Sequence, residues 1–129
     1  MQSFEIQITV TQEDLDNLNH VNNVRYVQWV QDVAEKHWHA KATKNILSDY
    51  VWILLNHNIA YKNPAVLGDV LTLKTYIKEA GGVTCLRIVD IYNKDTDKLL
   101  ASSETKWCLV TQANMKPARI TDTIRALFS

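Results

Sequence analysis

Glycine and proline are scarce in this sequence. Its 129 residues include three glycines and two prolines, about 4% of the chain where about 12% is usual. Because these residues form most tight turns, their scarcity predicts long helices and strands joined by few loops. It argues against a disordered chain, a collagen-like repeat and a sandwich of many short strands. The length suits one domain, residues 1–129, and the 47% apolar content is ordinary for a globular fold.

An excess of charge of one sign is also absent, since 14 basic residues balance 14 acidic ones. A nucleic-acid-binding protein normally needs surplus lysine and arginine to displace counterions from phosphates, so no nucleic acid partner is expected. The longest wholly apolar run, Val51 to Leu55, is far too short for a membrane span. The first ten residues lack a basic start followed by an apolar stretch. We therefore expect no signal peptide, no membrane partner and a cytoplasmic location.

The sequence offers little for metal or cofactor chemistry. Its two cysteines, Cys85 and Cys108, lie in strand-like apolar patterns without a CxxC spacing, which favours buried thiols. His37 and His39 are two residues apart in a helical pattern and so point to different faces. HExxH, GxSxG, P-loop and GxGxxG motifs are all missing. We expect no metal and no cofactor.

The apolar periodicity predicts one long helix after a first strand. Residues 4–10 alternate between apolar and polar side chains, as in a strand with one buried face. From Val24 to about His39 the period becomes helical, with Asn22 or Asn23 as the candidate N-cap. Trp29 lies off the main apolar stripe of this helix and could face a partner. The remaining segments are a short helix over 41–48, strands over 50–61, 70–78, 83–92 and 99–110, and an amphipathic turn or two over 121–128. This order predicts an α+β fold in which a five-stranded antiparallel sheet curls around one long helix.

One irregular stretch, residues 11–23, precedes the long helix and is crowded with Asp and Asn. Such residues often only order loops, by bonding local backbone groups. The alternative is catalytic: a helix N-terminus presents unpaired amides and a partial positive charge, which can stabilise a carbonyl oxygen as it becomes negative. A nearby carboxylate, Asp16, could attack that carbonyl or activate a water. Acyl transfer needs these two components, and both interpretations remain open at this point.

The same stretch carries a motif, DxDxxxHVNNxxY, formed by Asp14, Asp16, His20, Asn22-Asn23 and Tyr26. It resembles the signature of hot-dog-fold thioesterases, both the 4-hydroxybenzoyl-CoA type and the plant acyl-ACP type. The segment from Tyr61 to Asp69 is similar to the family's lead into its central strands, and the resemblance continues at 107–110, Pro117 and Ile120. It spans nearly the whole chain and implies a hot-dog fold.

The resemblance implies roles for five residues. Asp16 matches the family's catalytic carboxylate, acting as nucleophile or as general base on water. Asn23 matches the position whose backbone amide forms the oxyanion hole. His20, Asn22 and Tyr26 are expected to position the substrate or order the site, with Tyr26 mainly packing. Leu18 stands where the plant enzymes have a catalytic asparagine, so His20 is expected to position substrate or loop rather than act as a base.

The resemblance also implies a reaction and partners. The expected activity is hydrolysis of an acyl-CoA, or alternatively an acyl-ACP, in lipid metabolism. The alternatives are a hot-dog hydratase or dehydratase and a non-catalytic acyl-CoA-binding domain. Members of the family pair two protomers with continuous sheets and share each site across the interface, so a homodimer is expected, with a tetramer as the alternative. Asp69 is expected to bond turn amides, whereas Asp32 and Glu35 are expected to be solvated or to approach the partner's site.

Overall fold

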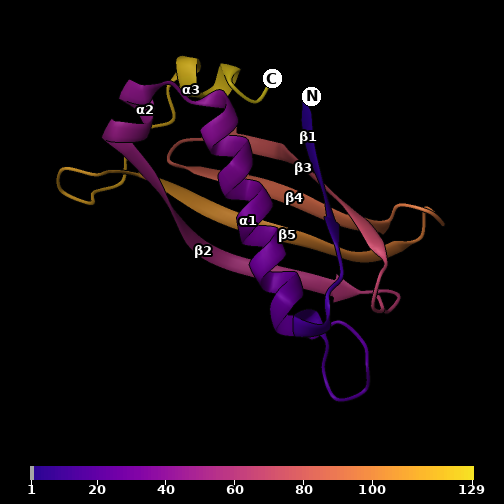
Figure 1. Cartoon of the computed structure of the whole chain (residues 1–129). Coiled ribbons are helices and arrows are strands. Elements are labelled where there is room, and N and C mark those ends of the chain that lie inside the picture. Colours follow the sequence, from indigo (N-terminus) through magenta and orange to yellow (C-terminus); the bar gives the residue numbers. More distant parts are fainter. Residues whose placement is uncertain (1) are drawn as a thin grey trace.

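The computed structural model describes residues 2–129 and shows the predicted hot-dog arrangement, one long helix against a five-stranded antiparallel sheet (Figure 1). Every element of the sequence prediction is present, with ends shifted by a few residues. In chain order the elements are β1 (Ser3–Thr9), the 3-10 helix η1 (Gln12–Asp14), α1 (Asn23–Lys41), α2 (Lys44–Asp49), β2 (Tyr50–Tyr61), β3 (Val70–Gly81), β4 (Thr84–Asn93), β5 (Leu99–Thr111) and α3 (Asp122–Ala126).

The sheet has the strand order β1-β3-β4-β5-β2, and every neighbouring pair is antiparallel. β3, β4 and β5 follow one another directly, because short turns connect them. β1 and β2 flank α1 in the sequence and end up at opposite edges of the sheet. Consequently α1 crosses the face of the sheet from one edge strand to the other (Figure 1).

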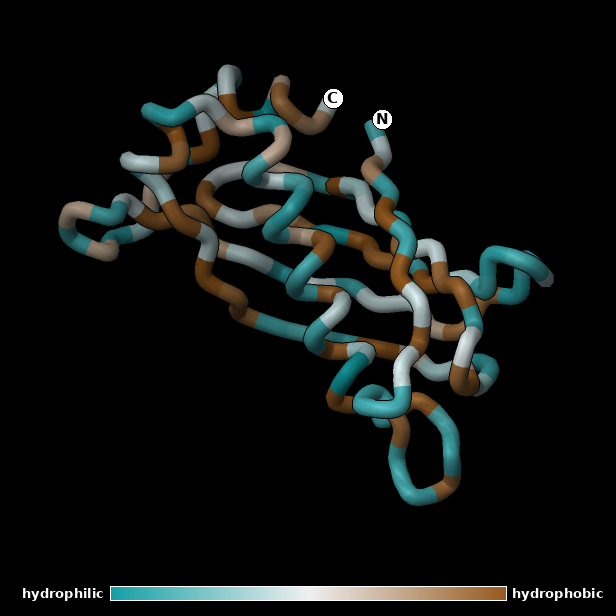
Figure 2. The backbone as a smooth tube through the Cα atoms, in the orientation of Figure 1, coloured by the Kyte–Doolittle hydropathy of each residue, from teal (hydrophilic) through white to brown (hydrophobic). Residues whose placement is uncertain are grey.

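α1 begins at a side-chain cap and is held by a wide apolar stripe. The Asn22 Oδ1 accepts a hydrogen bond from the Val24 N–H at 3.0 Å, which identifies Asn22 as the N-cap. Hydrophobic positions recur along the helix between hydrophilic ones (Figure 2). Its buried residues are Tyr26, Trp29, Val30, Val33, Ala34, His37 and Trp38.

The suggestion that Trp29 could face a partner is wrong. Its side chain is only 6% exposed and belongs to the core, packing edge-on against Tyr26 with ring centroids 5.6 Å apart. The reason is that the buried face of α1 is broader than a single narrow stripe, since it extends from Trp29 to Trp38 around the helix. Trp38, on the other half of the helix, packs into a second core cluster with Ile124 and Phe128 of the C-terminal region.

Two turns contain glycine in a left-handed conformation, and Asp69 and both cysteines behave as the sequence predicts. Gly68 and Gly82 adopt φ values of 86° and 61°, a conformation that favours glycine. The Asp69 Oδ2 accepts a hydrogen bond from the Val66 N–H at 3.0 Å, so Asp69 does bond a local amide. Cys85 and Cys108 are buried free thiols, and burial raises the pKa of Cys85 to about 11.

None of the helices within residues 2–129 is long and apolar enough to cross a membrane.

Candidate active site at the start of α1

The loop between η1 and α1 is anchored by a buried carboxylate, Asp14. Its Oδ1 accepts a hydrogen bond from the Arg25 Nε at 2.7 Å, and its Oδ2 accepts one from the Thr11 N–H at 2.8 Å. The Asp14 carbonyl oxygen also accepts from the Asn22 N–H at 2.8 Å. Asp14 therefore ties the two ends of the loop together, and both of its carboxylate oxygens are engaged.

The second aspartate of the motif, Asp16, closes a smaller loop within the first. Its Oδ1 accepts hydrogen bonds from the backbone N–H groups of Leu18 at 2.8 Å and His20 at 3.2 Å. The backbone of Asp16 also pairs with that of His20, and Asn19 turns the chain with φ of 60°. No described residue donates a hydrogen bond to the other carboxylate oxygen, Oδ2. Asp16 is thus fixed through one oxygen while the second stays available.

The helix start beside this loop offers an unpaired amide. Asn22 uses its side chain to satisfy the Val24 N–H and its carbonyl oxygen to accept from the Arg25 N–H at 2.9 Å. The N–H of Asn23, the first residue of α1, has no hydrogen-bond partner among residues 2–129. The first turn of α1 carries no acidic side chain, so nothing within the turn offsets the positive end of the helix dipole.

The residues singled out from the sequence come together around one open pocket of about 510 Å³ at this end of α1. Asp16 and His20 reach the pocket from the loop, whereas Asn22, Asn23 and Tyr26 reach it from the start of the helix. In Figure 1 the loop lies at the end of α1 opposite to α2 and α3. The structure therefore assembles all five predicted residues in one place, and their individual roles remain predictions.

Four lining residues at the end of β2 and just beyond it were not assigned to the site from the sequence. They are Tyr61, Lys62, Asn63 and Pro64. The Tyr61 ring packs edge-on against Tyr26 with centroids 5.4 Å apart, while Asn63 donates to the Leu99 carbonyl oxygen at 2.8 Å and holds this segment on β5. The family-like sequence around Tyr61 was the available signal, but periodicity cannot show that the end of β2 lies beside the start of α1.

The two tyrosines that line the pocket, Tyr26 and Tyr61, are uncharged. Burial raises the pKa of Tyr26 against a smaller opposing effect of its hydrogen bond with the Ala65 backbone, and burial likewise raises the pKa of Tyr61. Residues 2–129 contain no group of three His, Cys, Asp or Glu side chains placed to hold a metal ion. The site thus combines one free carboxylate oxygen, one free amide and neutral aromatic walls. Such a set can polarise a carbonyl and deliver a nucleophile to it.

Comparisons with known proteins agree with this architecture. Residues 10–128 match the family model of the thioesterase-like superfamily. A search among curated proteins found no match. Among solved structures, a 1,4-dihydroxy-2-naphthoyl-CoA thioesterase from Synechocystis superposes with a TM-score of 0.84 at 20% identity, with 98% of this chain and 96% of that chain covered.

Two further structures are similar to the chain at comparable distance. The probable thioesterase YbaW from Escherichia coli gives a TM-score of 0.85 at 22% identity, covering 95% of this chain and 94% of its own. The protein SAV2348 from Staphylococcus aureus, solved in complex with CoA, gives a TM-score of 0.84 at 21% identity, covering 98% and 81%. At these identities the structural similarity establishes the fold.

Proposed function

The chain belongs to the thioesterase-like superfamily, and we propose that it hydrolyses an acyl-CoA thioester in the pocket at the start of α1. One observation carries the proposal. A carboxylate with an unpaired oxygen, on Asp16, and an unpaired helix N-terminal amide, on Asn23, line the same open pocket. The family alone leaves the catalytic residues open, and this pairing is the reason for proposing Asp16 and Asn23.

The proposed chemistry uses these two groups on opposite sides of the thioester carbonyl. The Asn23 N–H donates to the carbonyl oxygen and stabilises the negative charge that develops as the carbonyl carbon becomes tetrahedral. Asp16 either takes a proton from the attacking water or attacks the carbon itself, and water then hydrolyses the resulting anhydride. In both routes the C–S bond breaks, the thiolate leaves and is protonated, and the acyl group ends as a carboxylic acid.

CoA is the carrier that we propose, with acyl carrier protein as the alternative. Lys62 lines the pocket and is exposed, which places a positive charge where a diphosphate could pair with it. The zero net charge of the chain gives no general attraction for an acidic carrier protein. One solved relative of the same fold is in complex with CoA.

The proposal is tested by supplying a panel of acyl-CoA esters with short, long and aromatic acyl groups and measuring the release of free thiol. Release of thiol together with the matching acid supports hydrolysis. Addition of water to an enoyl-CoA without thiol release would instead identify a hydratase. Tight binding of acyl-CoA with no turnover across the panel would identify a binding domain. Repeating the panel with acyl-ACP decides the carrier.

We also propose that the protein is a homodimer joined along β2. Both edge strands have one unpaired side, but β2 spans 12 residues and β1 only seven. β2 also exposes two large aliphatic side chains, Ile53 at 38% and Leu55 at 54%. Long apolar edges readily pair with a second strand. Joining two copies along β2 would make one continuous sheet.

A further inference from the structure

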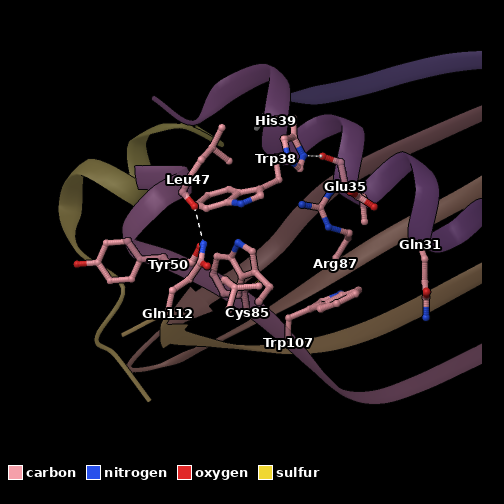
Figure 3. Close-up of a pocket in the computed structure, with 13 residues that line it drawn as sticks. Gln31, Glu35, Trp38, His39, Leu47, Tyr50, Cys85, Arg87, Trp107 and Gln112 are labelled. Atoms are coloured by element: carbon pink, nitrogen blue, oxygen red, sulfur yellow. Dashed lines mark hydrogen bonds between the residues drawn. The ribbon is translucent and has the colours of Figure 1, made fainter. Parts of the chain in front are cut away.

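A second cavity, of about 350 Å³, lies between the later turns of α1 and the sheet, apart from the pocket at the helix start (Figure 3). Arg87 of β4 and Trp107 of β5 line it from the sheet, and Trp38 and Glu35 line it from α1. It shares no lining residue with the first pocket. No step of the proposed hydrolysis uses these residues.

Arg87 is a buried cation whose polar contacts within the chain are all neutral. Its side chain is 4% exposed, and none of the ion pairs among residues 2–129 includes it. Its Nη1 donates to Thr75 Oγ1 at 2.9 Å and lies 3.0 Å from His37 Nδ1. The ring of Phe128 faces the guanidinium carbon at 5.7 Å. No described residue accepts a hydrogen bond from Arg87 Nε or Nη2.

The charge of this arginine persists although it is buried. Desolvation lowers the pKa of Arg87 to about 10, which leaves the side chain protonated at neutral pH. The pKa of His37 is lowered to about 4, mainly by burial and to a smaller extent by the charge of Arg87. The imidazole is therefore neutral, and its Nδ1 accepts a hydrogen bond from the Arg87 Nη1–H. Buried charges in proteins are normally paired with an opposite charge, because desolvating an unpaired ion is costly. The cluster therefore carries one positive charge and lacks an anion.

The rest of the cavity wall indicates the kind of molecule that supplies the anion. Trp38, Trp52 and Trp107 line the cavity, and the first two pack edge-on with centroids 5.7 Å apart. Indole walls suit an apolar or aromatic body. A single guanidinium pairs well with a planar carboxylate, through two parallel hydrogen bonds. With Glu35 also in the wall, a doubly charged phosphate is disfavoured.

We infer that this cavity binds a monocarboxylic acid with an apolar or aromatic body, and that Arg87 pairs with its carboxylate. The inference rests on the buried cation and the cavity and needs no turnover. If the proposed function holds, the ligand belongs to the chemical class that thioester hydrolysis releases. The acid bound here is then either a reaction product or an independent effector. Both share the same recognition chemistry.

The inference is tested with 3-phenylpropanoate and its neutral amide, titrated separately into the full-length protein at pH 7.5. Tryptophan fluorescence reports binding, because three indoles line the cavity, and calorimetry checks it. The acid should bind about 10- to 100-fold more tightly than the amide, as expected for a charge-assisted hydrogen bond. Equal binding of acid and amide, or no binding of either, overturns the inference.

Variants identify the group that pairs with the acid. Arg87→Met should remove the preference for acid over amide, whereas Arg119→Met, at an exposed arginine, should leave it unchanged. Glu35→Gln keeps Arg87 and removes the negative charge of the wall, so it should tighten acid binding about two- to five-fold. Glu35→Gln tests the inference even if Arg87→Met does not fold. An acid affinity of Glu35→Gln equal to that of the wild type contradicts the inference.

A carboxylate from a second copy of the chain could also pair with Arg87, and light scattering distinguishes this case. If Arg87→Met breaks a dimer but keeps the preference for acid, the counter-ion is a partner's carboxylate and the inference fails. Because these titrations contain no thioester, they stand even if the protein hydrolyses none. To separate product from effector, the acids released from the best thioester substrates are titrated in the same way. Tighter binding of those acids than of 3-phenylpropanoate identifies a product site, and weaker binding identifies an effector site.

Discussion

The Arg25 guanidinium donates to the Asp14 carboxylate at 2.7 Å, and this ion pair gives the two aspartates of the motif different tasks. Both carboxylate oxygens of Asp14 accept hydrogen bonds, from Arg25 and Thr11, and so hold the loop ahead of α1 in place. In Asp16, two residues later, only one carboxylate oxygen accepts hydrogen bonds. A structural carboxylate and a chemically available one thus lie two residues apart in the sequence.

The first prediction concerns the stability of that loop. Asp14→Ala removes a 3% exposed residue that accepts from both Thr11 and Arg25, and should lower the free energy of unfolding by about 1–3 kcal/mol. Urea unfolding measures the loss. Asp122→Ala is the matched control, because the Asp122 side chain is fully exposed and its ion pair with Arg125 at the surface should contribute nothing measurable. An Asp14 variant as stable as the control would show that the ion pair is not an anchor.

The second prediction isolates the amide of Asn23. Proline has no N–H but is well tolerated at the first position of a helix, and Asn22 already has a ψ of 137°, which suits a residue before proline. Asn23→Pro should therefore fold with a nearly unchanged urea midpoint and lose about 10²–10³ in kcat. Asn23→Ala keeps the amide and should retain most of the activity. Equal activity of the two variants would exclude an oxyanion role for this amide.

The third prediction concerns pH. Burial and the nearby Arg87 lower the pKa of His37 from 6.5 to about 4. Between pH 6.5 and pH 4 the unfolded chain binds a proton that the folded state does not, so stability falls as pH falls, by up to about 3 kcal/mol at this residue. Above pH 6.5 the contribution is constant.

Urea unfolding at pH 7.5, 6 and 5 checks this dependence. His37→Gln should flatten the decrease in stability toward acid pH, whatever its stability at pH 7.5. His39→Gln, at an exposed position two residues along the same helix, should keep the wild-type slope. A His37→Gln protein with the wild-type slope would contradict the assignment.

The fourth prediction addresses the proposed dimer. A lysine on an edge strand discourages pairing with another strand. Leu55→Lys on β2 should therefore shift the mass in light scattering from twice the 14.8 kDa of one chain toward 14.8 kDa. Gln7→Lys, at an exposed position on the opposite edge strand β1, should leave the mass unchanged. The reverse pattern would place the interface on β1.

The sequence was most informative where a feature is local. The alternation in β1 and the helical period of α1 are written in neighbouring residues, so both elements and the Asn22 cap were predictable. The Asp and Asn crowding before the helix marked the loop of the candidate site for the same reason.

The sequence could not show contacts between helices and strands that are far apart along the chain. Tyr61 reaches the pocket only because β2 ends beside the start of α1. The Arg87 cluster joins β3, β4 and α1 through residues 12 and 50 positions from Arg87. The prediction for Trp29 is wrong because periodicity indicates which residues share a helix face, but not how wide the buried face of the helix is.

The most direct test of the proposed function compares wild type with Asp16→Asn on the best acyl-CoA substrate. Asparagine keeps an Oδ1 that can accept from the Leu18 and His20 amides, so the fold, urea midpoint and affinity for acyl-CoA should be preserved. It lacks the charge needed to attack or to take a proton, so kcat for thiol release should fall at least about 100-fold. Thiol release by Asp16→Asn within a few-fold of wild type would contradict the assignment of Asp16 as the working carboxylate.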